Sequence, residues 1–300
     1  MVTLEHFKEL QRRYQPETVD FEYNTGYLMQ ATRNGTYIHT EDETAVIYTK
    51  KAADEGSQFV IVAAAGKDRS GLIMSAARSL SMMCPEAVII KNVGEDLEPD
   101  LKCAGCSEYG CGDMWDSYAK YDDNTYPQLI VDAEECAGLK GSKYTRLREE
   151  MNRCKRDYSI DVVEYDDESA FDRLLDMWAD RLAKSNGIDK AEIKRSHEMF
   201  RPVRDEFFQH CVRDADTGAV IGFLSFSEIS KNCLGFNALI NDFSYRNLYR
   251  LMMFEGIKIA DRLGYHYVNL QGSEDEAQYK SKLRFKPGIV ISKKHLVYCG

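Results

Sequence analysis

The sequence predicts an α/β protein with two similar halves, and three observations support this prediction. A run of strand, loop, helix and strand is expected over residues 59–91, and the same order recurs over residues 234–270. A chain of 300 residues exceeds the usual length of one domain and suits two. Its 44% hydrophobic and 29% charged residues are ordinary for a globular protein, which excludes collagen-like, low-complexity and wholly disordered chains.

The first half is expected to begin with a helix at Leu4–Tyr14. Three strands should follow, with Asn34-Gly35 as the turn after the first: Gly26–Thr32, Tyr37–Thr40 and Ala45–Thr49. The apolar run Phe59–Ala65 predicts a buried strand, which leads into a helix carrying Leu72 to Leu80 and a strand at Ala87–Lys91. A polar stretch, Glu95–Asp123, is expected to separate domains of residues 1–125 and 126–300.

The second half is expected to open with a basic linker helix at about residues 143–158 and two helices near 171–186 and 189–200. Three strands with a hairpin turn at 214–218 come next: Phe207–Arg213, Ala219–Glu228 and Leu234–Ile240. A long helix then follows Asn241–Ser244 and ends before Gly264. The order closes with a strand, a short helix and a strand: Tyr265–Leu270, Glu274–Lys282 and Ile289–Val297.

The charge balance argues against a protein whose main function is to coat nucleic acid, because 39 basic and 49 acidic residues give a net charge of −10. Two basic segments, 140–156 and 280–294, are candidates for a local positive groove, or else they are solvated faces. The longest apolar run, Phe59–Ala65, is far shorter than the ~20 residues of a membrane-spanning helix. No signal-peptide core is found, so the sequence predicts a cytoplasmic protein without a membrane partner.

Nine cysteines, an odd number, favour free thiols in a reducing compartment over a framework of disulfides. Three of them lie close together in a Gly-rich stretch: Cys103, Cys106 and Cys111. Zinc prefers four ligands in a tetrahedral arrangement, and the fourth would have to come from a distant residue such as Cys84 or Cys136. These thiols are a weak candidate site, and no metal is expected.

Two blocks of the second half resemble a known family. The first is Leu139-Lys140-Gly141-Ser142-Lys143-Tyr144, continuing to Arg148 and Asn152, and the second is Asn269-Leu270-Gln271-Gly272-Ser273-Glu274, followed by Lys282 to Pro287. Both are similar to the C-terminal domain of phosphatidylglycerol lysyltransferase, over roughly residues 125–300. The resemblance implies two GNAT-type domains in tandem, as in Fem-type aminoacyltransferases, each a mixed, mostly antiparallel sheet flanked by helices. It also implies transfer of an acyl or aminoacyl group to an amine or hydroxyl.

In a GNAT-like half the sheet opens after its fourth strand, here Leu234–Ile240, and the substrates meet in that split. Lys282 stands at the family's lysine position, where it would bind a donor phosphate or stabilise the tetrahedral oxyanion; the alternative is a lysine that faces solvent. Tyr279 would protonate the leaving group, or it serves packing. Glu228 and Asp242, at strand ends beside the split, are the candidate general bases.

Donor binding is assigned to basic and polar residues near the same split. Lys280, Arg284 and Lys286 would widen a positive surface for the acceptor end of tRNA, and Asn269 and Glu274 would orient the acceptor or cap the last helix. Arg246 lies in the segment Asp242–Leu248, which contains no glycine, whereas acyl-CoA enzymes of this fold use a Gly-rich loop there. This departure favours an aminoacyl-tRNA donor over CoA.

The first half has one sharp motif, formed by Gly66, Lys67, Asp68, Arg69, Ser70 and Gly71. It resembles the phosphate loop of cysteine-dependent protein phosphatases, but Val62 and Ala63 stand where that family has its His and nucleophilic Cys. Without a thiolate, phosphatase chemistry is excluded. The motif is then either an anion site, placed where this half would hold CoA, or a structural turn.

The sequence therefore predicts a transferase that moves an aminoacyl group, from aminoacyl-tRNA, to an amine or hydroxyl of a small molecule or peptide. One alternative is an acyl-CoA-dependent N-acyltransferase of the GNAT type. Another is a non-catalytic module that binds anions or RNA ends. The only cofactor-like molecule expected is the donor itself, aminoacyl-tRNA or acyl-CoA, and no residue pattern indicates the oligomeric state.

Overall fold

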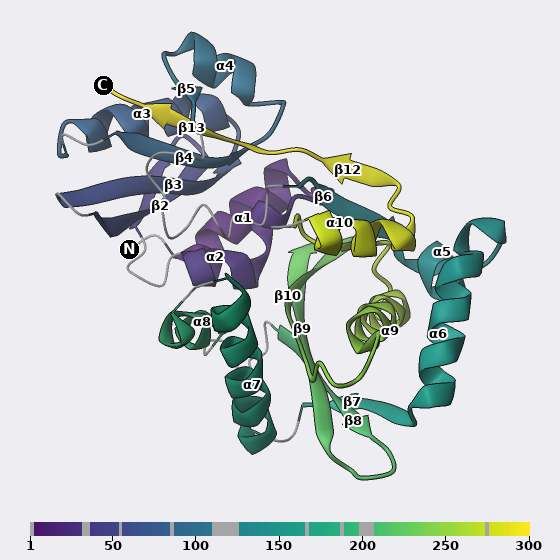
Figure 1. Ribbon diagram of the computed structural model, residues 1–300. Coiled ribbons are helices and arrows are strands. Elements are labelled where there is room, and N and C mark those ends of the chain that lie inside the picture. Colours follow the sequence, from purple (N-terminus) through teal and green to yellow (C-terminus); the bar gives the residue numbers. More distant parts are fainter. Residues whose placement is uncertain are drawn as a thin grey trace.

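A computed structural model describes residues 3–31, 37–53, 56–84, 87–109, 126–165, 168–186, 189–197, 207–273 and 276–300. These residues form two mixed sheets, one in each half, with helices on their faces (Figure 1). Within the described strands each sheet has one parallel pair, and its other neighbours are antiparallel. The predicted fold class, two α/β halves with mixed, mostly antiparallel sheets, is confirmed.

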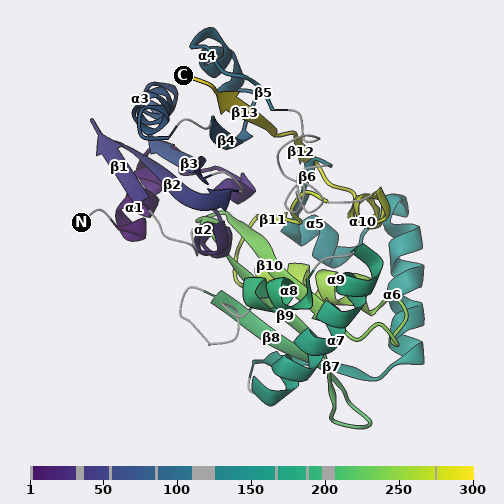
Figure 2. The same ribbon diagram turned by 60° about the vertical axis from the view of Figure 1, so that its left-hand side comes forward.

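The first sheet has six described strands in the order β1 (Tyr37–Glu41), β2 (Thr44–Ala53), β3 (Gly56–Gly66), β4 (Val88–Val93), β13 (Lys294–Tyr298) and β5 (Ser107–Glu108). Helices α1 (Leu4–Tyr14) and α3 (Arg69–Ser81) lie on opposite faces of it (Figure 2). Val46 and Ile61 pack with α3, whereas the alternate positions Ala45, Ile47 and Val62 pack with α1. Both faces are therefore buried, as the apolar run of β3 predicts.

The second sheet has seven described strands in the order β12 (Ile289–Ile291), β6 (Gln128–Asp132), β11 (Tyr267–Asn269), β10 (Cys233–Asn241), β9 (Val220–Ser230), β8 (Phe207–Asp214) and β7 (Ile160–Glu164). One face packs against α9 (Leu248–Arg262) and α6 (Thr145–Asp157). The other face packs against α7 (Glu168–Asn186). The shorter helices are α5 (Ala133–Gly138), α8 (Lys190–His197), α10 (Glu276–Lys282) and the 3-10 turns η3 (Ser142–Tyr144) and η5 (Leu283–Phe285).

The expected strand Ile289–Val297 is wrong as a single element, because the chain changes sheets within it. β12 pairs with β6 in the second sheet, whereas β13 lies between β4 and β5 in the first, where Figure 1 shows it in yellow among blue strands. Between the two strands the side chain of Lys293 is only 2% exposed and pairs with Asp20 at 3.0 Å and Glu22 at 3.5 Å. These ion pairs attach the segment between β12 and β13 to residues 20–22.

Two further expectations need correction. The segment expected as a strand near Gly26–Thr32 forms α2 (Thr25–Ala31), because the side chain of Asn24 accepts a hydrogen bond from the Tyr27 N–H (3.0 Å) and caps a helix. The stretch Glu95–Asp123 was expected to be a polar linker, but its described part contains a helix, α4 (Glu98–Cys103), and the strand β5. Asn34-Gly35 and residues 110–125 lie outside the described residues, so the boundary at residue 125 stays a prediction.

Residues 19–27, here called the junction segment, connect the two halves; they include η1 (Phe21–Tyr23). Towards the first half, the Tyr23 hydroxyl donates to the Ala64 carbonyl (2.9 Å). Towards the second half, the Phe21 N–H donates to Gln128 Oε1 (3.0 Å), and the Asn24 amide donates to the Gly235 carbonyl (3.3 Å). A Cβ at Gly235 would lie 2.7 Å from the Asn24 amide nitrogen, so the junction segment packs directly on β10.

Candidate functional site

The candidate site lies where the two parallel strands of the second sheet separate. β10 and β11 pair only at Cys233–Tyr267, Leu234–Val268 and Gly235–Asn269. β10 then continues to Asn241, while the chain leaves β11 after Asn269. Residues 236–241 and 270–273, which border this separation, are here called the second-half divergence. The split expected after Leu234–Ile240 therefore begins early in that strand.

Two amide side chains bracket the start of the divergence. The Gln271 side chain donates from Nε2 to the Phe236 carbonyl on the opposite strand, and its own N–H donates to Asn269 Oδ1 (2.7 Å). Asn269 is fully buried, and its Nδ2 donates to the Val19 carbonyl (2.7 Å) and to Gln128 Oε1 (2.9 Å). Asn269 is thus engaged with protein atoms and holds the second sheet against the junction segment.

A buried cation and a buried hydroxyl meet at the short segment 272–273. Lys282, the last residue of α10, is 3% exposed, and its Nζ donates to the Gly272 carbonyl. The neighbouring Ser273 is fully buried, and its Oγ has no hydrogen-bond partner among the described residues. Such an unpaired buried hydroxyl is uncommon, because the group has lost its water without compensation. Ser273 stands in the family block, but the sequence alone assigned it no role.

Tyr279 lies on the same helix as Lys282, one turn earlier. Its ring stacks on Tyr126, with centroids 5.0 Å apart and an interplanar angle of 21°. The Tyr126 N–H in turn donates to the Ser273 carbonyl (2.9 Å). The structure therefore brings together two predicted residues, Lys282 and Tyr279, with two that sequence reasoning missed, Ser273 and Tyr126.

The two predicted general bases lie far from each other. Glu228 is on β9 opposite Leu234, at the paired end of β10, and accepts a hydrogen bond from the Tyr265 hydroxyl (3.3 Å). Asp242 follows the other end of β10, where its Oδ1 accepts from the N–H and hydroxyl of Ser244 at 2.8 and 2.7 Å. Seven residues of extended strand between Leu234 and Asn241 span about 23 Å. The structure does not bring these two carboxylates together.

The predicted donor-binding cations have different surroundings. Lys280 is exposed and pairs with Glu276 at 2.9 Å, whereas Arg284 pairs with Glu150 of α6 at 2.5 Å. Arg246 and Lys286 are exposed, and Glu274 lies outside the described residues. Among these cations, Arg284 has its guanidinium group held in place by an ion pair with a residue of another helix.

The Gly66–Gly71 motif forms the start of α3, and the protein itself uses most of its amides. The N–H groups of Gly66, Lys67 and Asp68 donate to the Gln15 side chain (3.2 Å), the Glu43 carbonyl (3.3 Å) and the Thr44 hydroxyl (3.0 Å). The Asp68 carboxylate accepts from the Gly71 N–H (3.0 Å) and caps the helix. An internal carboxylate thus occupies the position that a bound anion would take.

The side chains of that motif also have partners within the first half. Arg69 donates to the carboxylate of Asp96 and to the Tyr23 hydroxyl (3.1 Å), and the Ser70 hydroxyl donates to Asp100 at 3.2 Å. These contacts favour the structural turn over the anion site, two interpretations that the sequence left open.

Two cysteines of the weak metal candidate are described, and both are free thiols. Cys103 is exposed, whereas Cys106 is buried, and burial raises the pKa of its thiol to about 11. A thiol with a raised pKa is a poor ligand and nucleophile near neutral pH. No group of three or more His, Cys, Asp or Glu residues suited to a metal occurs in the described part of the chain, and Cys111 lies outside it.

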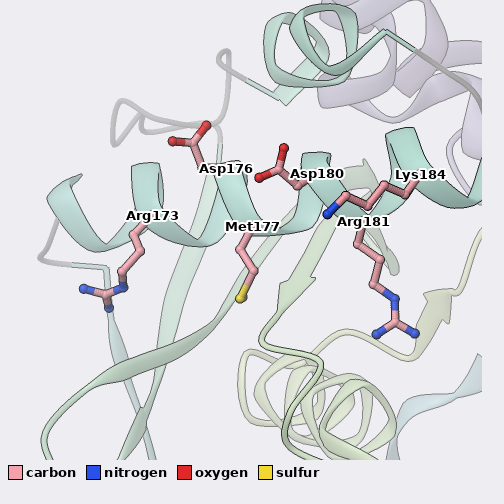
Figure 3. A pocket seen from close by; sticks show the side chains of 6 residues that line it. All are labelled: Arg173, Asp176, Met177, Asp180, Arg181 and Lys184. Carbon is pink, nitrogen blue, oxygen red and sulfur yellow. The ribbon is translucent and has the colours of Figure 1, made fainter.

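A separate pocket of about 730 Å³ lies along α7 and was not predicted (Figure 3). It is lined by alternating charges and one thioether: Arg173, Asp176, Met177, Asp180, Arg181 and Lys184. Arg181 extends from it over the ring of Phe243, 3.9 Å from the centroid, and Asp176 pairs with Lys194 of α8 at 2.8 Å. These contacts stabilise the packing of α7, and the mixed charges indicate no ligand class.

A family model described as phosphatidylglycerol lysyltransferase, C-terminal, matches residues 17–289. The chain belongs to this family. The match includes most of the first half, where the sequence showed no family motif, so the resemblance extends beyond residues 125–300. No curated protein matches the sequence.

Solved structures with the same fold cover nearly the whole chain. L-PGS from Bacillus licheniformis is 12% identical, with a TM-score of 0.65 over 98% of this chain and 91% of that one. FemX is 11% identical, with a TM-score of 0.65 over 99% and 96%. A tandem GNAT protein from the clavulanic acid biosynthesis pathway is 10% identical, with a TM-score of 0.57 over 99% and 95%.

At these identities the likeness establishes the fold, and the predicted tandem GNAT-like architecture is confirmed. The family is one of transferases, so the family member described here is assigned to the same general class. None of its described helices has the length and apolarity that crossing a membrane requires.

Proposed function

We propose that this family member is an aminoacyltransferase that takes an aminoacyl group, esterified to tRNA, and transfers it to an amine or hydroxyl of a small molecule or peptide. The strongest support is the buried Lys282 ammonium, which lies beside a Ser273 hydroxyl that has no partner among the described residues, at the second-half divergence. The family supports the reaction class, because its description names the transfer of a lysyl group.

The reaction needs a stabilised oxyanion and a protonated leaving group. The acceptor nitrogen or oxygen attacks the ester carbonyl, forming a tetrahedral intermediate whose oxygen carries the negative charge. A buried ammonium such as that of Lys282 stabilises this charge more strongly than an exposed one, because little water screens it. When the bond to the ribose breaks, the ribose oxygen takes a proton, for which the Tyr279 phenol is the candidate donor, and the acceptor's proton restores the phenol.

Positioning and oxyanion stabilisation carry most of the rate in this proposal. The two predicted carboxylates are engaged elsewhere, Asp242 with Ser244 and Glu228 with Tyr265. General-base help from either carboxylate would therefore be modest.

The start of α9 supports tRNA over acyl-CoA as the donor. A CoA pyrophosphate needs free main-chain N–H groups at that helix start. Here the Asp242 carboxylate accepts from the Ser244 N–H, so a negative group already lies in the loop, and the loop contains no glycine. In the first half the Asp68 carboxylate has the corresponding role at α3.

The test compares Lys282→Met with the control Lys102→Met in a transfer assay. Mixed tRNA charged with radiolabelled amino acids is incubated with a panel of amines, hydroxylated compounds and peptides, and labelled products are separated from tRNA. Lys282→Met should lower transfer at least tenfold, whereas Lys102→Met, whose exposed ammonium pairs with Glu98 on α4 of the first half, should not. Both variants are first shown to fold by circular dichroism and thermal melting.

The same assay discriminates the alternatives. Full transfer by folded Lys282→Met would remove this lysine from the mechanism. Transfer from acetyl-CoA but not from charged tRNA would favour a GNAT-type N-acyltransferase. Binding of tRNA with no acceptor ever modified would favour a non-catalytic RNA-end-binding module.

A further inference from the structure

Three arginines from three different elements surround a single carboxylate near the start of α9. Glu150 of α6 accepts through Oε2 from Arg250 of α9 (3.0 Å) and through Oε1 from Arg284 of η5 (2.5 Å). Arg146, one turn earlier on α6, lies 3.6 Å from the same Oε1. We call Arg146, Arg250 and Arg284 the arginine cluster.

The arginine cluster carries an excess of positive charge. Three guanidinium groups share one carboxylate, which leaves two positive charges without a counter-ion inside the cluster. Burial and the nearby charges of Arg284, Arg146 and Arg246 lower the pKa of Arg250, whereas Glu150 acts in the opposite direction. Crowding of like charges on partly buried side chains is costly unless an anion relieves it.

The geometry of the cluster suits phosphate groups. Guanidinium groups bind phosphate oxygens as well as carboxylate oxygens. Here Arg250 and Arg284 each reach one Glu150 oxygen through Nη1, so their other N–H donors are not used on this carboxylate. Arg250 is held by a second contact, from Nη2 to Asn247 Oδ1 (2.5 Å), so its orientation is fixed before any ligand arrives. The side chains of Arg250 and Arg284 are 21% and 28% exposed, and that of Arg146 is 76% exposed. A ligand can therefore approach from solvent.

The surroundings favour an extended polyanion over a single small phosphate. Arg153 is exposed on α6 seven residues after Arg146, so it lies on the same face about 10 Å further along the helix. Arg246 is exposed just before α9. Membrane binding would need exposed apolar side chains beside these cations. The large hydrophobic residues exposed in the described chain all lie outside α6, α9 and η5, the elements that carry the cluster: Tyr37, Met82, Met83, Leu263 and Val290.

We propose that Arg146, Arg250 and Arg284 bind the phosphodiester backbone of the donor RNA near its aminoacylated end, and that Glu150 holds their guanidinium groups in place until the phosphate replaces it. This inference rests on the proposed function, since it assigns the surface that holds the donor. Arg284 follows Lys282 by two residues, across the boundary of α10 and η5, which puts the cluster beside the proposed reaction centre. No bond is made or broken at the cluster.

The experiment measures binding of uncharged tRNA over a series of KCl concentrations by fluorescence anisotropy. The slope of log Kd against log salt reports the number of phosphates neutralised. Arg146→Gln, Arg250→Gln and Arg284→Gln should each lower the slope by about one and weaken binding several-fold at 0.1 M salt. Arg262→Gln is the matched control, because it is exposed at the opposite end of α9, and it should leave slope and affinity unchanged.

Glu150→Gln separates this proposal from a purely structural ion-pair network. Removal of the internal competitor should tighten RNA binding several-fold, whereas a structural role predicts unchanged or weaker binding. Arg146 is largely exposed, so its variant should fold even where Arg250→Gln or Arg284→Gln lowers stability. Thermal melts of all variants identify any that unfold.

Several outcomes would overturn the proposal. Unchanged salt slopes in the three arginine variants would remove the cluster from RNA binding. Wild-type protein that binds CoA, or vesicles containing phosphatidylglycerol, but not tRNA would refute RNA as the ligand. Because uncharged tRNA tests binding without chemistry, failure here is distinguishable from loss of transfer in Lys282→Met, which tests the proposed function.

Discussion

Both halves contain a parallel strand pair that separates, but the two separations are filled differently. In the first half, β3 and β4 pair only at Val60–Ile89 and Ile61–Ile90, after which β3 continues to Gly66. The junction segment bridges this separation: the Tyr23 hydroxyl binds the Ala64 carbonyl of β3, and the Tyr27 hydroxyl accepts from the Asn92 amide of β4 (2.5 Å). In the second half, residues 272–273 border the divergence: the Gly272 carbonyl accepts from Lys282, and the Ser273 hydroxyl has no partner in the part of the chain that the structure describes.

The comparison teaches that strand separation alone does not make a site. The first separation is occupied by aromatic side chains whose hydroxyls are paired, and its charged groups neutralise one another, as Lys293 does with Asp20 and Glu22. The second contains the Lys282 ammonium, which donates to the Gly272 carbonyl, and the Ser273 hydroxyl, which has no hydrogen-bond partner in the described part of the chain. A buried hydroxyl that folding leaves without a hydrogen-bond partner, as at Ser273 among the described residues, is available for chemistry.

The largest expected effect on stability comes from replacing Lys293, a buried lysine that contacts the junction segment. Lys293→Met should lower the free energy of unfolding by about 3 kcal/mol, because it leaves the buried carboxylate of Glu22 and the partly buried one of Asp20 without their cation. Transfer per folded molecule should not change. Urea unfolding measures the stability and the transfer assay measures the activity. A loss of transfer with unchanged stability would contradict the structural role of the first-half separation.

The pH dependence of stability should follow Glu22, whose pKa burial raises to about 7. Because the folded state favours the protonated carboxyl, its stabilising contribution is complete below the ordinary pKa of about 4.5 and is lost as pH rises through 7. Relative to Glu22→Gln, the wild type should lose up to about 3 kcal/mol between pH 4.5 and 8. Urea unfolding curves at several pH values check this, and parallel profiles for both proteins would exclude Glu22 as the source.

A smaller contrast is expected between two tyrosines. Tyr23→Phe should cost about 1–2 kcal/mol of stability, because the buried Ala64 carbonyl and one N–H of Arg69 each lose a hydrogen bond. Tyr279→Phe should leave stability nearly unchanged, since the ring still stacks on Tyr126, and should lower transfer if the phenol protonates the ribose oxygen. Chemical denaturation measures the stability of both variants, and initial rates measure their transfer activity. Normal transfer by Tyr279→Phe would mean that the Tyr279 ring serves packing only.

The smallest stability effect should come from Ser273→Ala. Removing a buried hydroxyl that has no partner among the described residues should be neutral or should stabilise by about 1 kcal/mol. A simultaneous fall in transfer would indicate that the hydroxyl is kept for function. If both stability and transfer are unchanged, Ser273 has no part in the site.

Sequence periodicity predicted the elements whose apolar spacing is regular, such as Leu4–Tyr14, the strand Phe59–Ala65 and the three strands between residues 207 and 241. It failed for α2, because the turn signal Asn34-Gly35 suggested a strand before it, whereas the deciding contact is the Asn24 cap. Three short elements between residues 128 and 164 were missed: β6, α5 and β7. The two strands pair with segments distant in sequence, and the helix packs on the distant α9.

The site was predicted in part. Lys282 and Tyr279 came from family motifs, and the structure brings them to one segment with Ser273. Glu228 and Asp242 were grouped because both stand near the carboxyl end of a strand. The two strands, β9 and β10, are antiparallel neighbours, so these ends lie at opposite ends of the pair. The arginine cluster could not be assembled from sequence, because Glu150 and Arg284 are 134 positions apart.

The position of β13 has a consequence for how the chain acquires its shape. The antiparallel neighbour of β4 is β13, residues 294–298. The first sheet can therefore be completed only after the strands of the second sheet have been synthesised. Contacts of such long sequence separation slow folding, and until they form, β4 presents an open edge. A fragment ending after the first half would therefore expose that edge and be prone to self-association.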